Sequence, residues 1–517
     1  MRKLFGQLEL ILILVVALAL PGCTVGPDFV KPELDAPADW SQSLQQGLES
    51  TPNELVEWWR VFDDPVLNEL VEVAHKNNNT LEIAGLRVLE ARAQLGIATG
   101  QLYPQTQVGT GAATWISPAE NTGVTSDFWQ YGLGASVSWE IDFWGRFRRG
   151  IESADAAYLA SIAAYEQALI LLTAGVVNSY AVIRTTEEQL RIAKENMKIQ
   201  QRSYDIAAVL YRNGATSELD MQQAETLLLS TRATIPDLQA SLKQARNALS
   251  TLLGLPPGAV DSMIAKTDGI PALPAEIAVG FPADMLRRRP DVRQAELLAM
   301  SQNALIGLAK ADLYPSFSLT GTIGLSSGGP GNSDFGDLFS SDALGITVGP
   351  SFVWPFLNYG RIKNNVRVQD ARLQQALVNY RETVLQAARE TEDAMAALIG
   401  NRAQSAILAD TVASAQRSNE LSVLRYQEGF ADYQRVLNAQ QSLFTQQTRY
   451  TTNLGNGLRS LVALYTALGG GWENRSESSL IDPETREQMQ QRTDWGKLLE
   501  TTDTQTESES IQRNTGQ

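Results

Sequence analysis

Residue types that carry out chemistry are scarce in this chain of 517 residues, which contains one histidine, His75, and one cysteine, Cys23. One motif, "GLSSG" from Gly324 to Gly328, fits the G-x-S-x-G pattern of serine hydrolases. That pattern requires a turn from a strand into a helix, and a histidine as the base. Here the motif opens a glycine-rich stretch between two expected strands. Catalysis is therefore the weaker hypothesis, and we predict that the chain is not an enzyme.

Metal, nucleotide and nucleic-acid sites are not predicted either. One histidine and one cysteine cannot form a His/Cys metal site, and His75, in "AHKNNNT", is expected at a helix end facing water. The stretch "GGPGN" lacks the lysine and the helix of a phosphate-binding loop, so we expect an extracellular loop there. With 42 basic and 58 acidic side chains the net charge is −16, which argues against DNA or RNA as a partner.

The N-terminus predicts export. Arg2 and Lys3 precede an apolar run from Leu8 to Leu20, which is shorter than the ~20 residues that span a bilayer. We therefore expect residues 1–22 to be a signal peptide that is removed.

The end of that signal, Leu20-Pro21-Gly22-Cys23, resembles a bacterial lipobox, with Pro21 replacing the small residue usual there. Cys23 is then expected to carry diacylglycerol and an N-acyl chain such as palmitate, which is preferred to a buried free thiol. Residues 23–62 would form a lipid-anchored segment, and Thr24 suits retention in the outer membrane. No other cofactor is expected.

The remainder of the chain is written twice. "WEIDFWGR" begins at Trp139 and "WPFLNYGR" at Trp354, 215 positions later. The same spacing separates three pairs of glycines, Gly145 and Gly360, Gly214 and Gly429, and Gly254 and Gly469. We predict two tandem structural repeats, residues 63–254 and 282–469. A Pro/Gly-rich linker, 255–281, separates them, and a polar tail, 470–517, is expected to be disordered.

Each repeat is predicted to start with a helix and to continue with two strands. The helices are expected over 81–101 and 291–312, because the Tyr-Pro pairs at 103–104 and 314–315 disfavour further helix. Apolar residues then alternate with Gly, Ser and Thr over 131–141, 317–325 and 344–354, and more weakly over 103–115.

These strands favour a lipid-facing barrel over a soluble sandwich. They run ~9 to 12 residues, the length that crosses an outer membrane, and aromatic residues gather near their ends. The aromatic residues are Tyr103, Trp115, Trp129, Tyr131, Trp139, Trp144, Tyr314 and Trp354. Four strands cannot close a barrel, and open edges are forbidden in lipid. Several chains must share one barrel, two giving eight strands or three giving twelve.

The third part of each repeat is a long helical hairpin. Residues 151–212 contain no proline and one glycine, which predicts a rod ~90 Å long. The apolar stretch 162–183 contains Glu166 and Asn178, so we expect a helix packed on several sides rather than a membrane span. A row of residues at alternating three- and four-residue spacing follows and predicts a packing seam between helices. On the first helix the seam is Leu190, Ala193, Met197, Gln200, Tyr204, Ala207 and Tyr211. On the returning helix it is Leu238, Leu242, Ala245, Leu249 and Leu252.

Each hairpin is expected to turn at a glycine. Gly214 can adopt the left-handed conformation that ends a helix, and "ATSELD" supplies a Thr or Ser cap for the next helix. "LRYQEGFADYQ", around Gly429, repeats the turn. A ring of such hairpins would prolong the shared barrel as a tube that tapers to the tips.

These features together resemble the outer-membrane factors of tripartite efflux pumps, the TolC/OprM-like, NodT-type lipoproteins. The resemblance covers nearly the whole mature chain: "CTVGPDFVKP", the paired "LYP" and "GR" motifs, "MLRRRPDVRQAE" and both Tyr-x-x-Gly tips. It implies an α+β membrane protein, a homotrimer with a twelve-stranded β-barrel, four strands per chain, continued by a helical periplasmic tunnel. A periplasmic adaptor and an inner-membrane RND pump would be its partners, and drugs or other small toxic compounds its cargo.

The resemblance also implies a periplasmic gate. At the family's tips a tyrosine of the second hairpin links to an aspartate of the first, here Tyr426 and Asp220. Two acidic positions of the family's constriction fall on Arg435 and Asn438, so an acidic throat is not transferred, although Asp432 offers a substitute. Ala431 replaces a family arginine latch. Adaptor contacts are expected at Arg212, Asn213, Gly214, Ser217, Glu428, Gly429 and Phe430.

Other readings of the same residues remain. Without the resemblance, Tyr426 would simply pack at a helix end and Asp220 would cap a helix or face water. Arg146, Arg148, Arg149, Arg361 and Lys363 mark either the periplasmic membrane border or ordinary helix starts. The alternatives to efflux are a type I protein-secretion channel and a structural lipoprotein whose rods bridge membrane and cell wall.

Overall fold

The computed structural model describes residues 24–33, 40, 48–49, 56–119, 126–267, 269–274, 276–278, 286–329, 334–472 and 480–499. Cys23 and the expected signal peptide lie outside these residues. The chain divides into two compact units. Unit 1 comprises Met1–Pro32, Leu89–Ala160 and Ala295–Tyr380, and unit 2 comprises Glu33–Val88, Ser161–Gln294 and Arg381–Gln517.

Unit 1 contains a four-stranded antiparallel sheet in the order β2-β3-β5-β6. The strands are β2 (Thr106–Ile116), β3 (Phe128–Ile141), β5 (Ser316–Ser327) and β6 (Leu344–Val353). All four expected strands are therefore present, with β3 starting three residues earlier than its alternation predicted. Among the described residues, β2 and β6 each pair on one side only, so both edges of the sheet are open.

The register separates the two faces of the sheet by polarity. Ala135 of β3 pairs with Ile323 of β5, which pairs with Ile346 of β6, so apolar residues align across the strands. The neighbouring register positions place Ser136 beside Thr322 and Thr347 on the opposite face. Side chains on the apolar face are exposed: Leu133 51%, Val137 45%, Ile323 51%, Ile346 64% and Val348 69%. One face is thus apolar and uncovered within this chain, and the other carries Ser, Thr and Gly.

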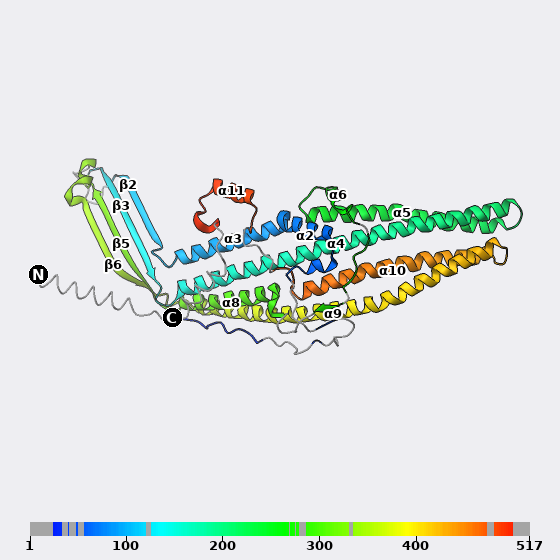
Figure 1. The fold of residues 1–517 in the computed structure, drawn as a ribbon. Helices are drawn as coiled ribbons and strands as arrows, with labels where there is room; N and C mark the ends of the chain where they lie inside the picture. Colours follow the sequence, from blue (N-terminus) through cyan, green and yellow to red (C-terminus); the bar gives the residue numbers. More distant parts are fainter. Residues whose placement is uncertain are drawn as a thin grey trace. The chain divides into compact units, whose positions relative to one another are not determined.

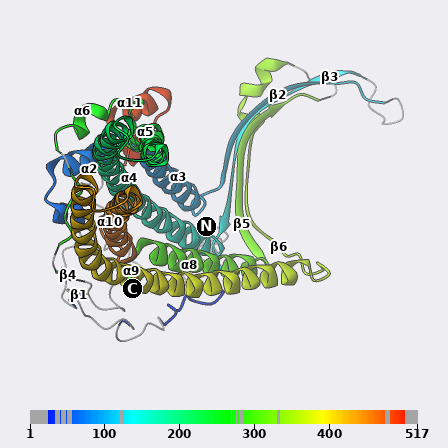
Figure 2. The same cartoon turned by 90° about the vertical axis from the view of Figure 1, so that its right-hand side faces the viewer.

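The sheet curves strongly along its strands, as Figure 2 shows. A row of glycines crosses its polar face, because Gly134 pairs with Gly324 and Gly324 with Gly345. A Cβ atom added at Gly134 would lie 3.1 Å from the carbonyl oxygen of Ile323. The absence of side chains at this row allows the strands to approach closely and the sheet to curve there.

Four long helices form two hairpins that turn in unit 2 (Figure 1). Helices α4 (Arg146–Arg212) and α9 (Arg361–Gln427) each have 67 residues, and α5 (Glu218–Leu252) and α10 (Tyr433–Ala467) each have 35. The first residues of each pair are 215 positions apart. At 1.5 Å per residue α4 is ~100 Å long, because it begins at Arg146 rather than at Ile151 as predicted.

The shorter elements complete the two units. Helices α3 (Asn79–Gly100) and α8 (Pro290–Ala311) have 22 residues each and match the two expected first helices. The others are β1 (Leu48–Glu49), η1 (Trp58–Phe62), α2 (Pro65–Asn77), α6 (Asp261–Ile264), β4 (Ile277–Ala278), η3 (Phe335–Phe339), η4 (Ser341–Ala343), α11 (Pro483–Arg492) and η5 (Gly496–Leu499). β1 and β4 form a parallel pair.

The expected packing of the long helices is largely confirmed. Ala193, Gln200 and Ala207 of the seam are buried, whereas Tyr211 is 38% exposed and departs from the prediction. Gln440 donates to Ser203 at 2.6 Å and Asn196 to Gln447 at 2.6 Å, so α4 and α10 meet partly through polar contacts. Among the described helices, α4 alone is long and apolar enough to cross a membrane, but most of that apolar stretch is buried inside the protein.

The polar tail is not wholly without structure, which corrects the prediction for 470–517. Asp482 accepts hydrogen bonds from the amides of Glu484 and Thr485, and Pro483 occupies the first turn of α11. The backbone of Leu480 lies so close to Gly85 of α3 that a Cβ atom there would overlap it. Residues 480–499 therefore pack on unit 2. Residues 473–479 and 500–517 lie outside the described part of the chain.

Candidate functional site

The two hairpin tips are built by the same backbone device. Gly214 has φ +73° and Gly429 has φ +79°. The amide of Ala215 donates to the carbonyl of Leu210 at 2.9 Å, and the amide of Phe430 donates to that of Arg425 at 2.8 Å. These are the hydrogen bonds of a Schellman motif, which ends a helix on a left-handed residue. The repeated Tyr-x-x-Gly motif thus marks two equivalent turns, as expected.

A small aromatic cluster lies behind these turns. Tyr426 at the end of α9 is 7% exposed, and Tyr433 at the start of α10 is 1% exposed. Their ring centroids are 5.3 Å apart in an edge-to-face arrangement. Ala207 of α4 and Ala224 of α5 pack against the same cluster, so it joins both hairpins.

Asp220 lies beside this cluster and is bound locally. Its carboxylate accepts a hydrogen bond from the Thr216 hydroxyl, and its amide donates to Ser217 Oγ at 3.4 Å. Ser217 is therefore the N-cap of α5, as the "ATSELD" pattern predicted.

The hydroxyl of Tyr426 is buried and makes no hydrogen bond of ordinary geometry to any residue that the structure describes. Burial raises the pKa of Tyr426, and the negative charge of Asp220 raises it further, while the Thr216 hydroxyl acts in the opposite direction. Burial likewise raises the pKa of Tyr433. Tyr426 and Asp220 are thus close enough to interact electrostatically, with Thr216 interacting with both of them.

The other expected gate residues are exposed. Arg435 Nε lies 3.8 Å from Asp432 Oδ1, and both side chains are about three-quarters exposed. Asn438 accepts a hydrogen bond from Gln434 at 3.0 Å. Asp432 starts α10 without a side-chain capping bond, so its carboxylate faces Arg435 and water. Ala431 is partly buried at the turn.

The expected adaptor-contacting residues form the exposed ends of both hairpins. Arg212, Asn213, Gly214, Ser217, Glu428, Gly429 and Phe430 are all exposed. Two large apolar side chains are prominent there, because Phe430 is 81% exposed and Leu219 is 63% exposed. Leu219 was not predicted; its position two residues after the Ser217 cap, on the first exposed turn, would have indicated it.

Tyr433 and Thr216 were also missed by the sequence reasoning. Tyr433, Val436, Gln440 and Leu443 follow a three-four spacing, and all four are buried. That seam would have placed Tyr433 inside the tip. The contact of Thr216 with Asp220, four positions later, could have been read from the first turn of α5.

The segment that follows Cys23 packs firmly within unit 1. The amide of Val25 donates to the carbonyl of Trp144 at 3.0 Å, and Arg149 Nη2 lies 2.7 Å from Asp28 Oδ1. Gly26, at φ +109°, touches Gly307 so closely that a Cβ atom would lie 2.4 Å from its Cα. Arg149 is buried, so it holds this segment rather than simply starting a solvated helix.

Aromatic side chains gather at both ends of the sheet. At one end Trp129 contacts both Trp115 and Tyr131, and Tyr131 also contacts Phe335. At the other end Trp144 stacks on Tyr314 at 4.5 Å between centroids. Indole N–H groups at this end donate to main-chain carbonyls, Trp139 to Leu102, Trp144 to Pro315 and Trp354 to Leu313. This is the pattern of interfacial aromatic girdles that flank an apolar band.

Neither the G-x-S-x-G motif nor His75 has the surroundings that a catalytic site would require. Gly324 to Ser327 lie within strand β5, so the G-x-S-x-G motif is not a strand-to-helix elbow. His75 is near the end of α2, as expected, but it does not face water. It lies 2.7 Å from Thr173 Oγ1 and edge-to-face with Trp59, and burial lowers its pKa from 6.5 to about 4. It is a packed, neutral side chain.

Solved structures of outer-membrane channels share this fold. The outer-membrane channel OprN matches with a TM-score of 0.81 and 31% identity over 87% of this chain and 100% of that one. CmeC of Campylobacter jejuni matches with a TM-score of 0.81 and 26% identity over 90% and 100%. The mostly helical fold with its small sheet is therefore that of an outer-membrane channel protein.

The chain belongs to the outer membrane efflux protein family, whose model matches residues 70–255 and 281–470. It is 33% identical to the cation efflux system protein CusC of Escherichia coli O6:H1 over 460 residues, 89% of this chain and 98% of that one. It is 30% identical to the toluene efflux pump outer membrane protein TtgF of Pseudomonas putida over 480 residues. This chain is an outer-membrane efflux channel, and the resemblance seen in its motifs is confirmed.

Proposed function

We propose that three copies of this chain form one twelve-stranded barrel that a helical tunnel continues into the periplasm. The observation that carries this proposal is the sheet, which has an uncovered apolar face, a Ser/Thr/Gly face and two open edges. Open edges are not tolerated in hydrocarbon, so other chains must pair with β2 and β6. The matching lengths of α4 and α9, and of α5 and α10, support two tandem structural repeats in each chain.

The cargo is proposed to be small toxic solutes, including drugs, that an inner-membrane RND pump drives through the duct. Relatives of this chain are named for cation, toluene and antibiotic efflux, which favours small solutes over secreted proteins. A periplasmic adaptor would bind the exposed tips, where Leu219 and Phe430 offer apolar contacts. The channel itself supplies no energy and acts as a passive duct.

Closure of the periplasmic end is assigned to the tip cluster. Tyr426 and Tyr433 hold the end of α9 and the start of α10 against α4 and α5. We assign to Thr216 the role of linking Tyr426 to Asp220, because it donates to the carboxylate and interacts with the phenol. Arg435 and Asn438 would line the entrance next to this link.

The test of the function is conductance of the purified, full-length protein in planar lipid bilayers. The wild type is expected to conduct weakly, and the Tyr426→Phe plus Asp220→Asn variant to open more often or more widely. The control is Tyr211→Phe plus Asp205→Asn, the same chemical changes at two exposed positions of α4, which should leave conductance unchanged. Absence of conductance in every protein would favour the structural lipoprotein that bridges membrane and cell wall. Native mass spectrometry in detergent should give the mass of three chains.

We also propose that Cys23 is lipidated. The residues just after it pack beside Trp144, next to the aromatic end of the sheet that includes Tyr314, which suits an anchor at the membrane border. Mass spectrometry of the mature protein should find the acyl modifications at Cys23. A Cys23→Ser chain should lack them, and an unmodified wild-type N-terminus would contradict the proposal.

A further inference from the structure

Helix α10 differs in charge from the rest of the chain. The protein as a whole has more acidic than basic residues, 58 against 42. Within Tyr433–Ala467 the sequence has no Asp or Glu and three arginines, Arg435, Arg449 and Arg459. Asp432, just before the helix, is the carboxylate that faces Arg435.

The three arginines lie on one face of α10. Positions 435, 442, 449 and 456 are seven residues apart, as are 438, 445, 452 and 459, so the two series form a single stripe along the helix. Every residue of this stripe is exposed and polar, including Arg435, Asn438, Thr445, Arg449, Asn456 and Arg459. No large apolar side chain of α10 is exposed in the described structure. We call this surface the α10 stripe.

Helix α9 presents the opposite kind of surface in the same unit. Leu385 is 62% exposed, Ile407 67% and Leu424 49%. Exposed apolar side chains in such numbers are suited to burial against a neighbouring chain, whereas a face of arginines, amides and hydroxyls is suited to water. If the chains assemble through apolar faces such as that of α9, the α10 stripe remains available to line the water-filled duct.

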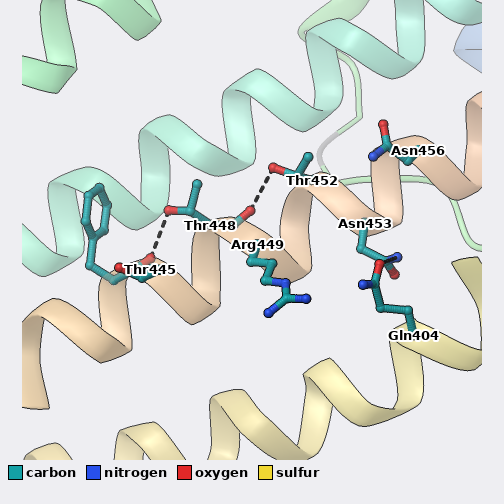
Figure 3. A pocket seen from close by; sticks show the side chains of 8 residues that line it. Gln404, Thr445, Thr448, Arg449, Thr452, Asn453 and Asn456 are labelled. Atoms are coloured by element: carbon teal, nitrogen blue, oxygen red, sulfur yellow. Dashed lines mark hydrogen bonds between the residues drawn. The ribbon is translucent and has the colours of Figure 1, made fainter.

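Arg449 is placed to bind rather than to support the fold. It lines a pocket of about 500 Å³ between α10 and Gln404 of α9, and Figure 3 shows its guanidinium reaching away from the α10 backbone. The lining contains hydroxyls and amides and no carboxylate. The hydroxyls of Thr448 and Thr452 donate hydrogen bonds to main-chain carbonyls of α10, at 2.9 and 2.8 Å. Neither Arg449 nor Arg459 takes part in an ion pair with any residue that the structure describes.

We propose that the α10 stripe is a cationic wall of the export duct that favours anionic solutes, with Arg449 and its pocket as a binding point. The ligand class is small anions that carry a carboxylate, sulfonate or phosphate group, because the planar guanidinium fork matches such oxygens. This inference rests on the proposed duct and names the charge of the solutes that pass through it most readily.

The experiment measures the reversal potential of the reconstituted full-length protein in a potassium chloride gradient. The wild type is expected to prefer chloride over potassium. The Arg449→Gln plus Arg459→Gln variant should shift the reversal potential toward zero, and the Arg449→Glu plus Arg459→Glu variant should change its sign. Arg449→Lys plus Arg459→Lys should retain the wild-type value. The matched control is Arg492→Gln plus Lys497→Gln, which also removes two positive charges, from exposed positions within residues 480–499.

A second readout uses pyranine, a fluorescent trisulfonate, added at micromolar concentration. It should reduce the wild-type current, and the glutamine variant should need a higher concentration for the same reduction. A conducting wild type that prefers potassium, or variants that leave both readouts unchanged, would overturn this inference and leave the duct intact. A wild type that does not conduct under any condition would contradict the proposed duct itself.

Discussion

Tyr211 and Tyr426 stand 215 positions apart, at the same place in two helices of 67 residues, yet Tyr211 is 38% exposed and Tyr426 is 7% exposed. The same contrast recurs along the two hairpins. Glu218 begins α5 in water, whereas Tyr433, its counterpart, is buried at the start of α10. The two hairpins thus share one backbone plan, but the aromatic tip cluster and the α10 stripe lie on the second hairpin only. The two hairpins have the same helix lengths and turns, but they differ in which side chains they bury and expose.

The largest difference between the two hairpins is expected when Tyr426 and Tyr211 are each replaced by alanine. Tyr426→Ala takes a ring out of the tip cluster and should lower the free energy of unfolding by about 3 to 5 kcal/mol. Tyr211→Ala, at the matching exposed position, should lower it by less than about 1 kcal/mol. Thermal and urea unfolding of the detergent-solubilised protein measures both. Equal losses would show that the two tips are packed alike.

Tyr426→Phe tests whether the ring or the hydroxyl of Tyr426 stabilises the tip. The hydroxyl that it removes is buried without a regular hydrogen bond, so the change should be nearly neutral for stability. A stability loss as large as that of the alanine variant would mean that the phenol itself, rather than the ring, holds the tip.

The next largest effect concerns pH. His75 is packed in unit 2, and Leu286 stands 211 positions later, the spacing of the two first helices. Because burial lowers the pKa of His75 from 6.5 to about 4, the unfolded chain binds a proton there more readily than the folded chain between these values. Stability from this group is therefore full above pH 6.5 and is lost as the pH falls toward 4, by about 3 kcal/mol.

The measurement is the midpoint of urea unfolding at several pH values. His75→Leu, which copies the residue of the second repeat, should flatten the profile between pH 6.5 and 4 while leaving the carboxylates in place. A variant with the same slope as the wild type would assign the pH dependence to those carboxylates.

A smaller effect is expected at the glycines that end α5 and α10. Gly254 has φ +66°, and a Cβ atom there would lie 2.1 Å from the carbonyl oxygen of Asn77. Gly469 has φ +72°, with the nearest atom at 3.3 Å. Gly254→Ala should therefore destabilise the protein by at least about 2 kcal/mol, and Gly469→Ala by only about 1 kcal/mol of backbone strain. Thermal unfolding distinguishes them, and the reverse order would contradict the close approach at Asn77.

The smallest effect separates the two helix starts. Ser217 caps α5 through a side-chain hydrogen bond, and Asp432, 215 positions later, begins α10 without one. Ser217→Ala should cost about 1 kcal/mol, and Asp432→Ala only a few tenths, chiefly from lost charge at the helix N-terminus. Urea unfolding and hydrogen exchange of the first turns would measure the difference. A larger loss for Asp432→Ala would show that its contact with Arg435 matters more than capping.

The sequence predicted those features that depend on local patterns. Alternation placed the four strands, and the left-handed preference of glycine placed both hairpin turns, because each is decided by neighbouring residues. The partners of His75 could not be foreseen, since Thr173 lies 98 positions away. Helix α11 was missed although Asp482-Pro483 is a readable start signal, because the surrounding composition was polar. The hydrogen bond between Thr216 and Asp220 was missed because the family resemblance pointed to Tyr426 and Asp220 alone.

The open edges of the four-stranded sheet have a consequence for how the protein is made. Each of β2 and β6 has an outer edge of amides and carbonyls with which no other strand of the described chain pairs. Unpaired backbone amides and carbonyls are energetically costly in hydrocarbon, so these strands would be unstable in the membrane in a single chain. For the proposed trimer, membrane insertion and assembly of the three chains should therefore occur in one step. We expect the yield of membrane-embedded strands in refolding experiments to depend on protein concentration, while helix content does not.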